Sequence, residues 1–166
     1  MTKRLIFISG TMGVGKTTVS KLLFTELNNS VFLDGDWCWS INPFIVNEEN
    51  KIMVIENICF LINSFIKNTT LQNIIFCWVM NKQEIIDEIR NRLIGEYNFY
   101  HFTLLTDTDF LKSHLEKDTK NGLRENYDIE QAVEYMEQYK KINSVKIDNV
   151  ENDIYATVGK IKDYLK

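Results

Sequence analysis

Apolar residues recur along the chain with two different periods, and segments of the two kinds alternate. Short runs that are apolar nearly throughout are typical of strands buried on both faces of a parallel sheet. Apolar residues at every third or fourth position are typical of helices that bury one side. The short runs predict strands at residues 5–9, 31–33, 73–80, 98–105 and 144–147. The helical periods predict helices at residues 16–27, 52–66, 84–93, 108–117, 128–142 and 153–165.

This alternation indicates the fold class. Strands separated by helices are typical of α/β folds with a mainly parallel sheet. The chain has 166 residues and is 45% apolar, which suits a single domain, 1–166, with one sizeable core. The most polar stretch, residues 118–126, contains Gly122 and is expected to be a mobile loop between two helices.

Charge and cysteine usage exclude several classes of protein. The net charge of −4 has the wrong sign for a general nucleic-acid binder. No apolar run is long enough for a secretory signal or for a membrane span, so we expect a cytoplasmic protein without a membrane partner. Cys38, Cys59 and Cys77 form no CxxC pair, and we expect buried free thiols rather than a disulfide or a zinc site.

Residues 10–17, GTMGVGKT, match the phosphate-binding pattern G-x-x-x-x-G-K-[ST] between the first predicted strand and helix. Backbone N–H groups of such a loop converge on an anion, and the helix N-terminus adds partial positive charge. Typical residue frequencies make a chance match in a chain of this length an event of about 1% or less. We therefore predict that the loop binds a nucleoside triphosphate, with Lys16 at the β- and γ-phosphates and Thr17 ligating Mg²⁺. The predicted nucleotide contacts in this loop are Gly10, Thr11, Met12, Gly13, Val14, Gly15, Lys16, Thr17 and Thr18.

Asp34-Gly35-Asp36, directly after the second predicted strand, helps to separate a switch, a motor and a kinase. A GTPase would need NKxD, but residues 81–84 read NKQE and no DxxG precedes them. A motor ATPase would place an acid at the end of a strand to polarise water, and the third predicted strand ends without one. The apolar strand that does end in an acid is the second one, which places the carboxylates beside the phosphate-binding loop.

The loop, followed by D-x-D about eighteen residues beyond Lys16, resembles the small P-loop kinases, including shikimate, adenylylsulfate and nucleoside monophosphate kinases. The layout of nearly the whole chain most resembles tunicamycin-resistance-type and nucleotide-kinase-like proteins. The segments that carry this wider resemblance are the strand 100–105, the helix 109–115 and Ile147-Asp148-Asn149. The resemblance implies a five-stranded parallel sheet in the order 2-3-1-4-5, and a small lid at about 117–127. It also implies an adenine site near Asp148 and Asn149, and transfer of the γ-phosphoryl of Mg-ATP to a hydroxyl of a small molecule.

The resemblance also suggests roles for the acids. Asp34 would orient Mg²⁺ through its water ligands, and Asp36 would accept the hydrogen bond and then the proton of the acceptor hydroxyl. The alternative is that both residues only form a DG turn with side-chain-to-backbone hydrogen bonds. Kinases of this type carry arginines in the lid, where this chain has Arg124, and it has His114 where relatives commonly have arginine.

The acceptor side of the predicted site is poor in cations. Residues 37–72 contain no arginine, and their only lysines are Lys51 and Lys67. Trp37, Trp39 and Phe44 are either core residues or the aromatic wall of a substrate pocket. An unpaired anion would be costly to desolvate there, so we expect a neutral or cationic acceptor, such as a nucleoside or an antibiotic.

Two further alternatives stay open. The chain could be a monophosphate-kinase-like protein, or a non-catalytic resistance protein that binds ATP. For every one of these functions we expect a monomer or a homodimer. We interpret His101 as structural, and Arg90 and Arg92, on a helix rich in Glu and Asp, as part of a solvated ion-pair face.

Overall fold

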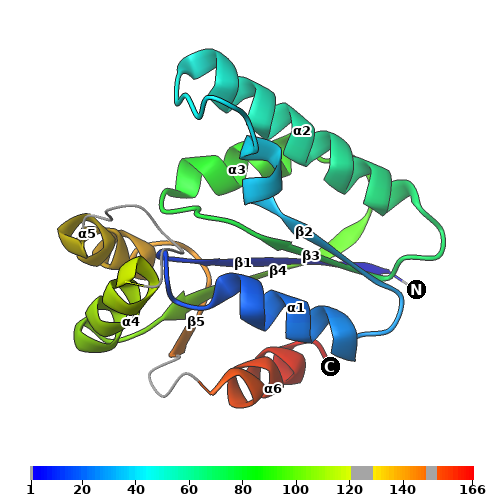
Figure 1. The fold of residues 1–166 in the computed structure, drawn as a ribbon. Coiled ribbons are helices and arrows are strands. Elements are labelled where there is room, and N and C mark those ends of the chain that lie inside the picture. Colours follow the sequence, from blue (N-terminus) through cyan, green and yellow to red (C-terminus); the bar gives the residue numbers. More distant parts are fainter. Residues whose placement is uncertain (1, 121–128, 149–152) are drawn as a thin grey trace.

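The computed structural model describes residues 2–120, 129–148 and 153–166, and within them the chain forms one parallel sheet (Figure 1). Its strands are β1 (Lys3–Gly10), β2 (Ser30–Asp34), β3 (Asn73–Cys77), β4 (Tyr97–Leu105) and β5 (Val145–Asp148). Their order across the sheet is β2-β3-β1-β4-β5, and every pair is parallel. The predicted fold class and strand order are confirmed.

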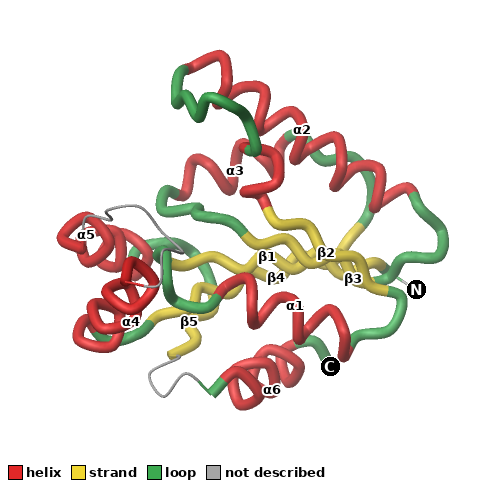
Figure 2. The backbone as a smooth tube through the Cα atoms, viewed as in Figure 1, coloured by secondary structure: helices red, strands yellow, loops and turns green. Residues whose placement is uncertain are grey.

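Helices cover both faces of the sheet and so form three layers (Figure 2). α1 (Lys16–Glu26) and α6 (Ile154–Tyr164) lie on one face, and α2 (Glu48–Lys67) and α3 (Gln83–Asn91) lie on the other. α4 (Thr108–Lys120) and α5 (Ile129–Lys140) lie side by side at the end of the sheet where β1 leads into α1 (Figure 1).

Alternate residues of β1 divide the core into two parts. Leu5 and Phe7 are fully buried beneath α2 and α3, and Ile6 and Ile8 are fully buried toward α1 and α6. Burying such a side chain contributes about 1.5–3 kcal/mol relative to leaving it exposed, so the two apolar layers are the main source of the sheet's stability.

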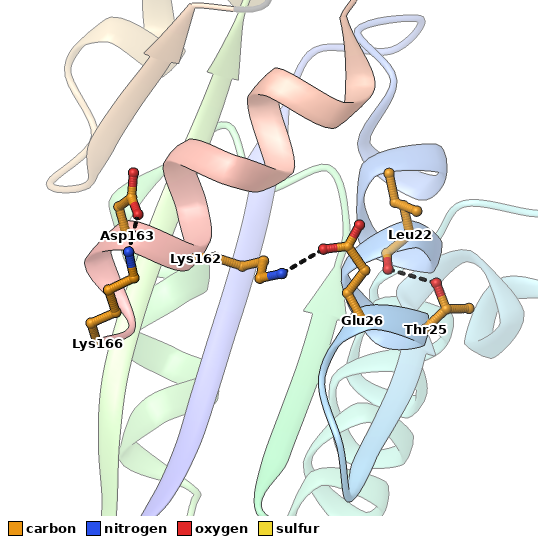
Figure 3. A network of polar contacts seen from close by, with 6 residues as sticks. All are labelled: Leu22, Thr25, Glu26, Lys162, Asp163 and Lys166. Atoms are coloured by element: carbon orange, nitrogen blue, oxygen red, sulfur yellow. Dashed lines mark hydrogen bonds and ion pairs between the residues drawn. The ribbon is translucent and has the colours of Figure 1, made fainter.

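α1 and α6 are also joined at their surface by polar contacts (Figure 3). The Lys162 ammonium lies 2.7 Å from the Glu26 carboxylate, and both side chains are partly exposed. An exposed pair of this kind stabilises by about 1 kcal/mol at most. The burial of Leu23 in one apolar cluster with the α6 residues Val158 and Ile161 therefore contributes more to this interface.

Three departures from prediction bear on the functional site. β3 ends at Cys77, so the prediction that residues 78–80 extend this strand was wrong. A short 3₁₀ helix, η1 (Gly35–Trp39), follows β2 and was not predicted. α4 continues to Lys120, so residues 118–120 of the predicted loop are helical, while residues 121–128 lie outside the described part of the chain.

The three cysteines are free, as predicted, with Cys59 and Cys77 buried and Cys38 half-buried. In the described ranges no helix combines the length and the apolar character that crossing a membrane would require.

Candidate functional site

The phosphate loop connects the end of β1 to the start of α1. Gly15 stands directly before α1 with a φ of 93°, a left-handed conformation that favours glycine. The first turn of α1 contains no acidic side chain, so the partial positive charge of its N-terminus is not offset there. The Lys16 ammonium donates a hydrogen bond of 3.0 Å to the carbonyl oxygen of Thr11, across the loop. The loop therefore gathers backbone donors and one cation at a single point.

A hydrogen bond joins the loop to the acid at the end of β2. The Thr17 hydroxyl donates to Asp34 Oδ2 at 2.9 Å, and Asp34 is only 6% exposed. The other oxygen, Asp34 Oδ1, accepts from the backbone N–H of Asp36 at 3.1 Å and so caps η1. Asp34 thus makes the turn contact that the sequence offered as the alternative to a catalytic role, and it also lies beside the phosphate loop.

Cys77 lies beneath this pair, opposite Asp34 in the register of β2 and β3. Its sulfur is 4.0 Å from the Thr17 hydroxyl. Burial, and secondarily the negative charge of Asp34, raise the pKa of the Cys77 thiol to about 12. The thiol is therefore neutral at physiological pH and adds no charge beside Thr17 and Asp34.

Asp36 is exposed, one residue beyond Gly35 in η1. Trp78, the first residue after β3, packs directly on Gly35: a Cβ there would lie 2.4 Å from Trp78 Cγ. Sequence reasoning placed Trp78 inside a strand and so missed its contact with the Asp34–Asp36 turn. The register could have indicated it, because β2 and β3 end at paired residues, Asp34 and Cys77.

The three predicted substrate aromatics do not form one cluster. Trp39 and Phe44 meet edge to face with ring centroids 5.8 Å apart, and Phe44 is 63% exposed. Trp37 instead packs edge to face on Phe32, with 5.4 Å between centroids. The structure thus brings Trp39 and Phe44 together and places Trp37 against β2.

The phosphate loop also contacts the α4–α5 pair. The Thr11 hydroxyl donates a buried hydrogen bond of 3.0 Å to the carbonyl oxygen of Ala132 in α5. Gly13 faces Leu115 of α4, because a Cβ there would lie 3.0 Å from Leu115 Cδ2. The loop is therefore packed against the two helices that flank the predicted lid.

The remaining predicted residues are placed only in part. Asp148 is the exposed last residue of β5, while Asn149 and Arg124 lie outside the described residues, as does the side chain of His114. The Arg92 guanidinium pairs with Glu88 at 2.6 Å, and that of Arg90 lies over the ring of Phe99, 4.1 Å from its centroid. Both arginines are thus engaged at the carboxyl end of α3, and Phe99 lies in the amino-terminal half of β4.

Oxygen ligands for a hard cation are present at the loop. Over residues 2–120, 129–148 and 153–166, no group of three or more His, Cys, Asp or Glu side chains could enclose a metal. The paired hydroxyl and carboxylate of Thr17 and Asp34 suit Mg²⁺, which prefers oxygen, keeps several waters and is completed by substrate phosphates.

Comparison with known proteins assigns the chain to a family. The family model described as "AAA domain" matches residues 6–145. No curated protein matches the sequence.

Several solved structures share the fold at low sequence identity. A sugar kinase from Janibacter sp. HTCC2649 superposes with a TM-score of 0.70 at 15% identity, over 98% of this chain and 94% of that one. The tunicamycin resistance protein of Deinococcus radiodurans gives 0.65 at 14% identity, over 96% and 95%. A shikimate kinase from Bacteroides thetaiotaomicron gives 0.65 at 17% identity, over 97% of each chain.

These likenesses agree with the order β2-β3-β1-β4-β5 and with the complete phosphate-loop motif, and they confirm the resemblance to P-loop kinases drawn from the sequence. The chain belongs to the AAA domain family and has the fold of the P-loop small-molecule kinase superfamily.

Proposed function

We propose that the chain transfers the γ-phosphoryl group of ATP to a hydroxyl group of a small molecule that is neutral or cationic. The observation that carries the proposal is the 2.9 Å hydrogen bond between Thr17 and Asp34 beside the phosphate loop. It joins the residue that would ligate Mg²⁺ in this motif to a buried carboxylate. The kinases among the structural neighbours support the same reaction class.

Thr17 and Asp34 would hold Mg²⁺, directly or through its waters. When bound, the ion would neutralise phosphate charge that develops during the transfer. Lys16 and the N–H groups of the loop bind the phosphates and orient the γ-phosphoryl group, which accounts for most of what the protein must do in this reaction.

Asp36 is the candidate base. It follows the buried Asp34 by two residues and is itself exposed, on the 3₁₀ turn that Asp34 caps. In the proposed step the acceptor oxygen forms a bond to the γ-phosphorus, and the bond from that phosphorus to the β–γ bridging oxygen breaks. ADP leaves with the bond's electrons, and the acceptor's proton passes to the Asp36 carboxylate.

The acceptor side disfavours an anionic molecule. Trp39, Phe44 and Trp78 offer aromatic surface near the turn. Lys51 pairs with Glu48 at 2.7 Å, and Lys67 stands in the last turn of α2, at the end far from η1. An anionic group on the acceptor would therefore lack a cation from residues 37–72, whereas a nucleoside-like or antibiotic-like hydroxyl compound would not need one.

The decisive experiment compares Asp36→Asn with the parent chain once a screen of nucleosides, sugars and antibiotics has found a molecule that stimulates ADP formation. The variant should bind an ATP analogue with unchanged affinity but lose phosphoryl transfer by about a hundredfold or more, because an amide cannot take the proton. Asp163→Asn, at an exposed acid paired with Lys166, is the control and should leave both quantities unchanged. Near-normal transfer by Asp36→Asn would place the base elsewhere. ATP binding without stimulated ADP formation by any acceptor would favour a non-catalytic, ATP-binding role.

The charge of the acceptor is tested by steady-state turnover with AMP, CMP, UMP, GMP and shikimate against the corresponding nucleosides and uncharged cyclitols. We expect saturable turnover only with uncharged compounds. Saturable phosphorylation of any of the anions at micromolar concentration would instead indicate a monophosphate-kinase-like activity.

A further inference from the structure

A cavity of about 430 Å³ opens beside the amino-terminal half of β4, where β5 begins. We propose that this cavity is a second ligand site, for a small organic carboxylate that carries an amide and an aromatic or apolar body. The proposal does not depend on the proposed kinase activity, since it uses other residues and a binding measurement.

The first observation is an unpaired strand edge. β4 has nine residues, but β5 pairs only with Phe102–Leu105. The edge of Tyr97–His101 on the β5 side therefore has no strand partner, and alternate residues of a strand direct their N–H and C=O groups to such an edge. Among the described residues none forms a backbone hydrogen bond with these groups on that edge. An amide in the ligand would pair with them as an added strand does.

The second observation is a positioned cation. Arg90 lines the cavity, and its guanidinium is held over the Phe99 ring at 4.1 Å. Among the described residues no carboxylate pairs with Arg90, whereas Arg92, two residues on, pairs with Glu88 at 2.6 Å. A guanidinium whose fork of N–H groups is not used by the described residues matches the planar, two-oxygen geometry of a carboxylate.

A second positive charge lies behind the cavity wall. Lys146 donates to the hydroxyl of Ser144 at 2.7 Å, and Ser144 lines the cavity. His101, also in the wall, is buried and has its pKa lowered first by that burial and further by the charges of Lys146 and Arg90. The histidine is therefore neutral, and Arg90 and Lys146 are cations beside the cavity.

The rest of the lining suits an apolar body. Phe99, Tyr100 and Tyr164 contribute rings, and Tyr164 is 56% exposed. The Gln83 side chain lines the cavity, but its amide accepts from the Asn143 N–H and donates to Asp87, so these hydrogen bonds are not available to a ligand. Aromatic walls, a few fixed polar groups and this volume are typical of small-molecule sites.

The test is a titration of the full ¹⁵N-labelled chain with N-acetyl-L-phenylalanine, a compound that has a carboxylate, an amide and an aromatic ring. Binding is measured from the changes in backbone amide chemical shifts. We expect saturable shifts at Phe99, Tyr100, His101 and Val145 with a dissociation constant in the millimolar range or below. N-acetyl-L-phenylalaninamide, which lacks the charge, should bind about tenfold or more weaker to the same chain.

Variants then assign the charge to its partner. Arg90→Gln should weaken binding of the carboxylate by about tenfold or more while leaving the weak binding of the amide unchanged. Arg92→Gln, on the same helix, should bind both as the parent does. Equal binding of the two probes, shifts confined to the phosphate loop, or no saturable shift at β4 would each overturn the proposal. The comparison of probes on the parent chain stands even if Arg90→Gln does not fold.

Discussion

Lys16 carries the only side-chain positive charge within the phosphate-loop motif, and its ammonium is bonded to the Thr11 carbonyl. A bound phosphate would offer it a charged acceptor in place of a neutral one. At about 4 Å and an effective dielectric of 20, that attraction is worth roughly 4 kcal/mol as an upper limit.

The variant Lys16→Ala should therefore bind an ATP analogue about a hundredfold or more weaker than the parent chain, as measured by titration calorimetry. Lys21→Ala, which removes an exposed lysine of the same helix, is the matched control and should bind as the parent does. Unchanged affinity in Lys16→Ala would remove the basis for assigning the loop to phosphate binding.

Asp34 illustrates how much one residue can do at this scale. One oxygen ends β2 by capping η1, and the other holds the Thr17 hydroxyl. The same carboxylate therefore fixes the turn that carries Asp36 and the position of the residue proposed to ligate Mg²⁺. Structural and functional interpretations of an acid in such a turn are not exclusive.

At the scale of elements, two glycines provide a matched pair. A Cβ on Gly35 would lie 2.4 Å from Trp78 Cγ, whereas a Cβ on Gly159, in α6, would meet nothing within 4 Å. Gly35→Ala should destabilise the fold by about 1–3 kcal/mol, because the turn or the indole must move. Gly159→Ala should stabilise it by about 0.5–1 kcal/mol, because glycine is unfavourable within a helix.

Urea unfolding of the two variants measures both effects, and a shift of the same sign in both would contradict them. Nucleotide affinity distinguishes an effect on the site from an effect on packing alone. Gly35→Ala should change this affinity, because it disturbs the turn between Asp34 and Asp36. Gly159→Ala should leave the affinity unchanged.

The elements themselves were largely predictable from the sequence, and their ends were less so. The apolar run 73–80 has one character throughout, yet β3 stops at Cys77, since β2 beside it stops at Asp34 and leaves Trp78 free to pack on Gly35. That end is set by a tertiary contact, for which periodicity contains no information.

The candidate site divides in the same way. The phosphate loop is a local motif, so its residues and its place between β1 and α1 could be predicted in full. The bond from Thr11 to Ala132, and the separation of Trp37 from Trp39, depend on side chains far apart in the sequence or on opposite sides of a turn. No spacing rule in a single sequence encodes them.

At the scale of the whole molecule, a row of hydrogen-bonded polar side chains crosses the centre of an otherwise apolar sheet. Ser9 at the end of β1 bonds to His101 Nε2 at 2.9 Å and to the Thr103 hydroxyl at 3.0 Å, and Thr103 bonds to Ser144 at 2.6 Å. It begins one residue before the phosphate loop and ends at the wall of the β4 cavity. His101 is the member of this network that titrates in the acid range, so it links the stability of the fold to pH.

Burial lowers the pKa of His101 to about 4, against 6.5 for an ordinary histidine; the positive charges of Lys146 and Arg90 add to the shift and the backbone of Asn143 partly opposes it. Between these two pH values the unfolded chain binds a proton that the folded chain does not, so stability is full above pH 6.5 and is lost as the pH falls toward 4. The loss amounts to about 3 kcal/mol. His101→Gln, which keeps a donor near Ser9 but cannot titrate, should be less stable than the parent at neutral pH yet lose less stability on acidification. Urea unfolding at a series of pH values measures this, with carboxylate protonation common to both chains. Parallel pH profiles for the parent and His101→Gln would show that another group governs acid unfolding.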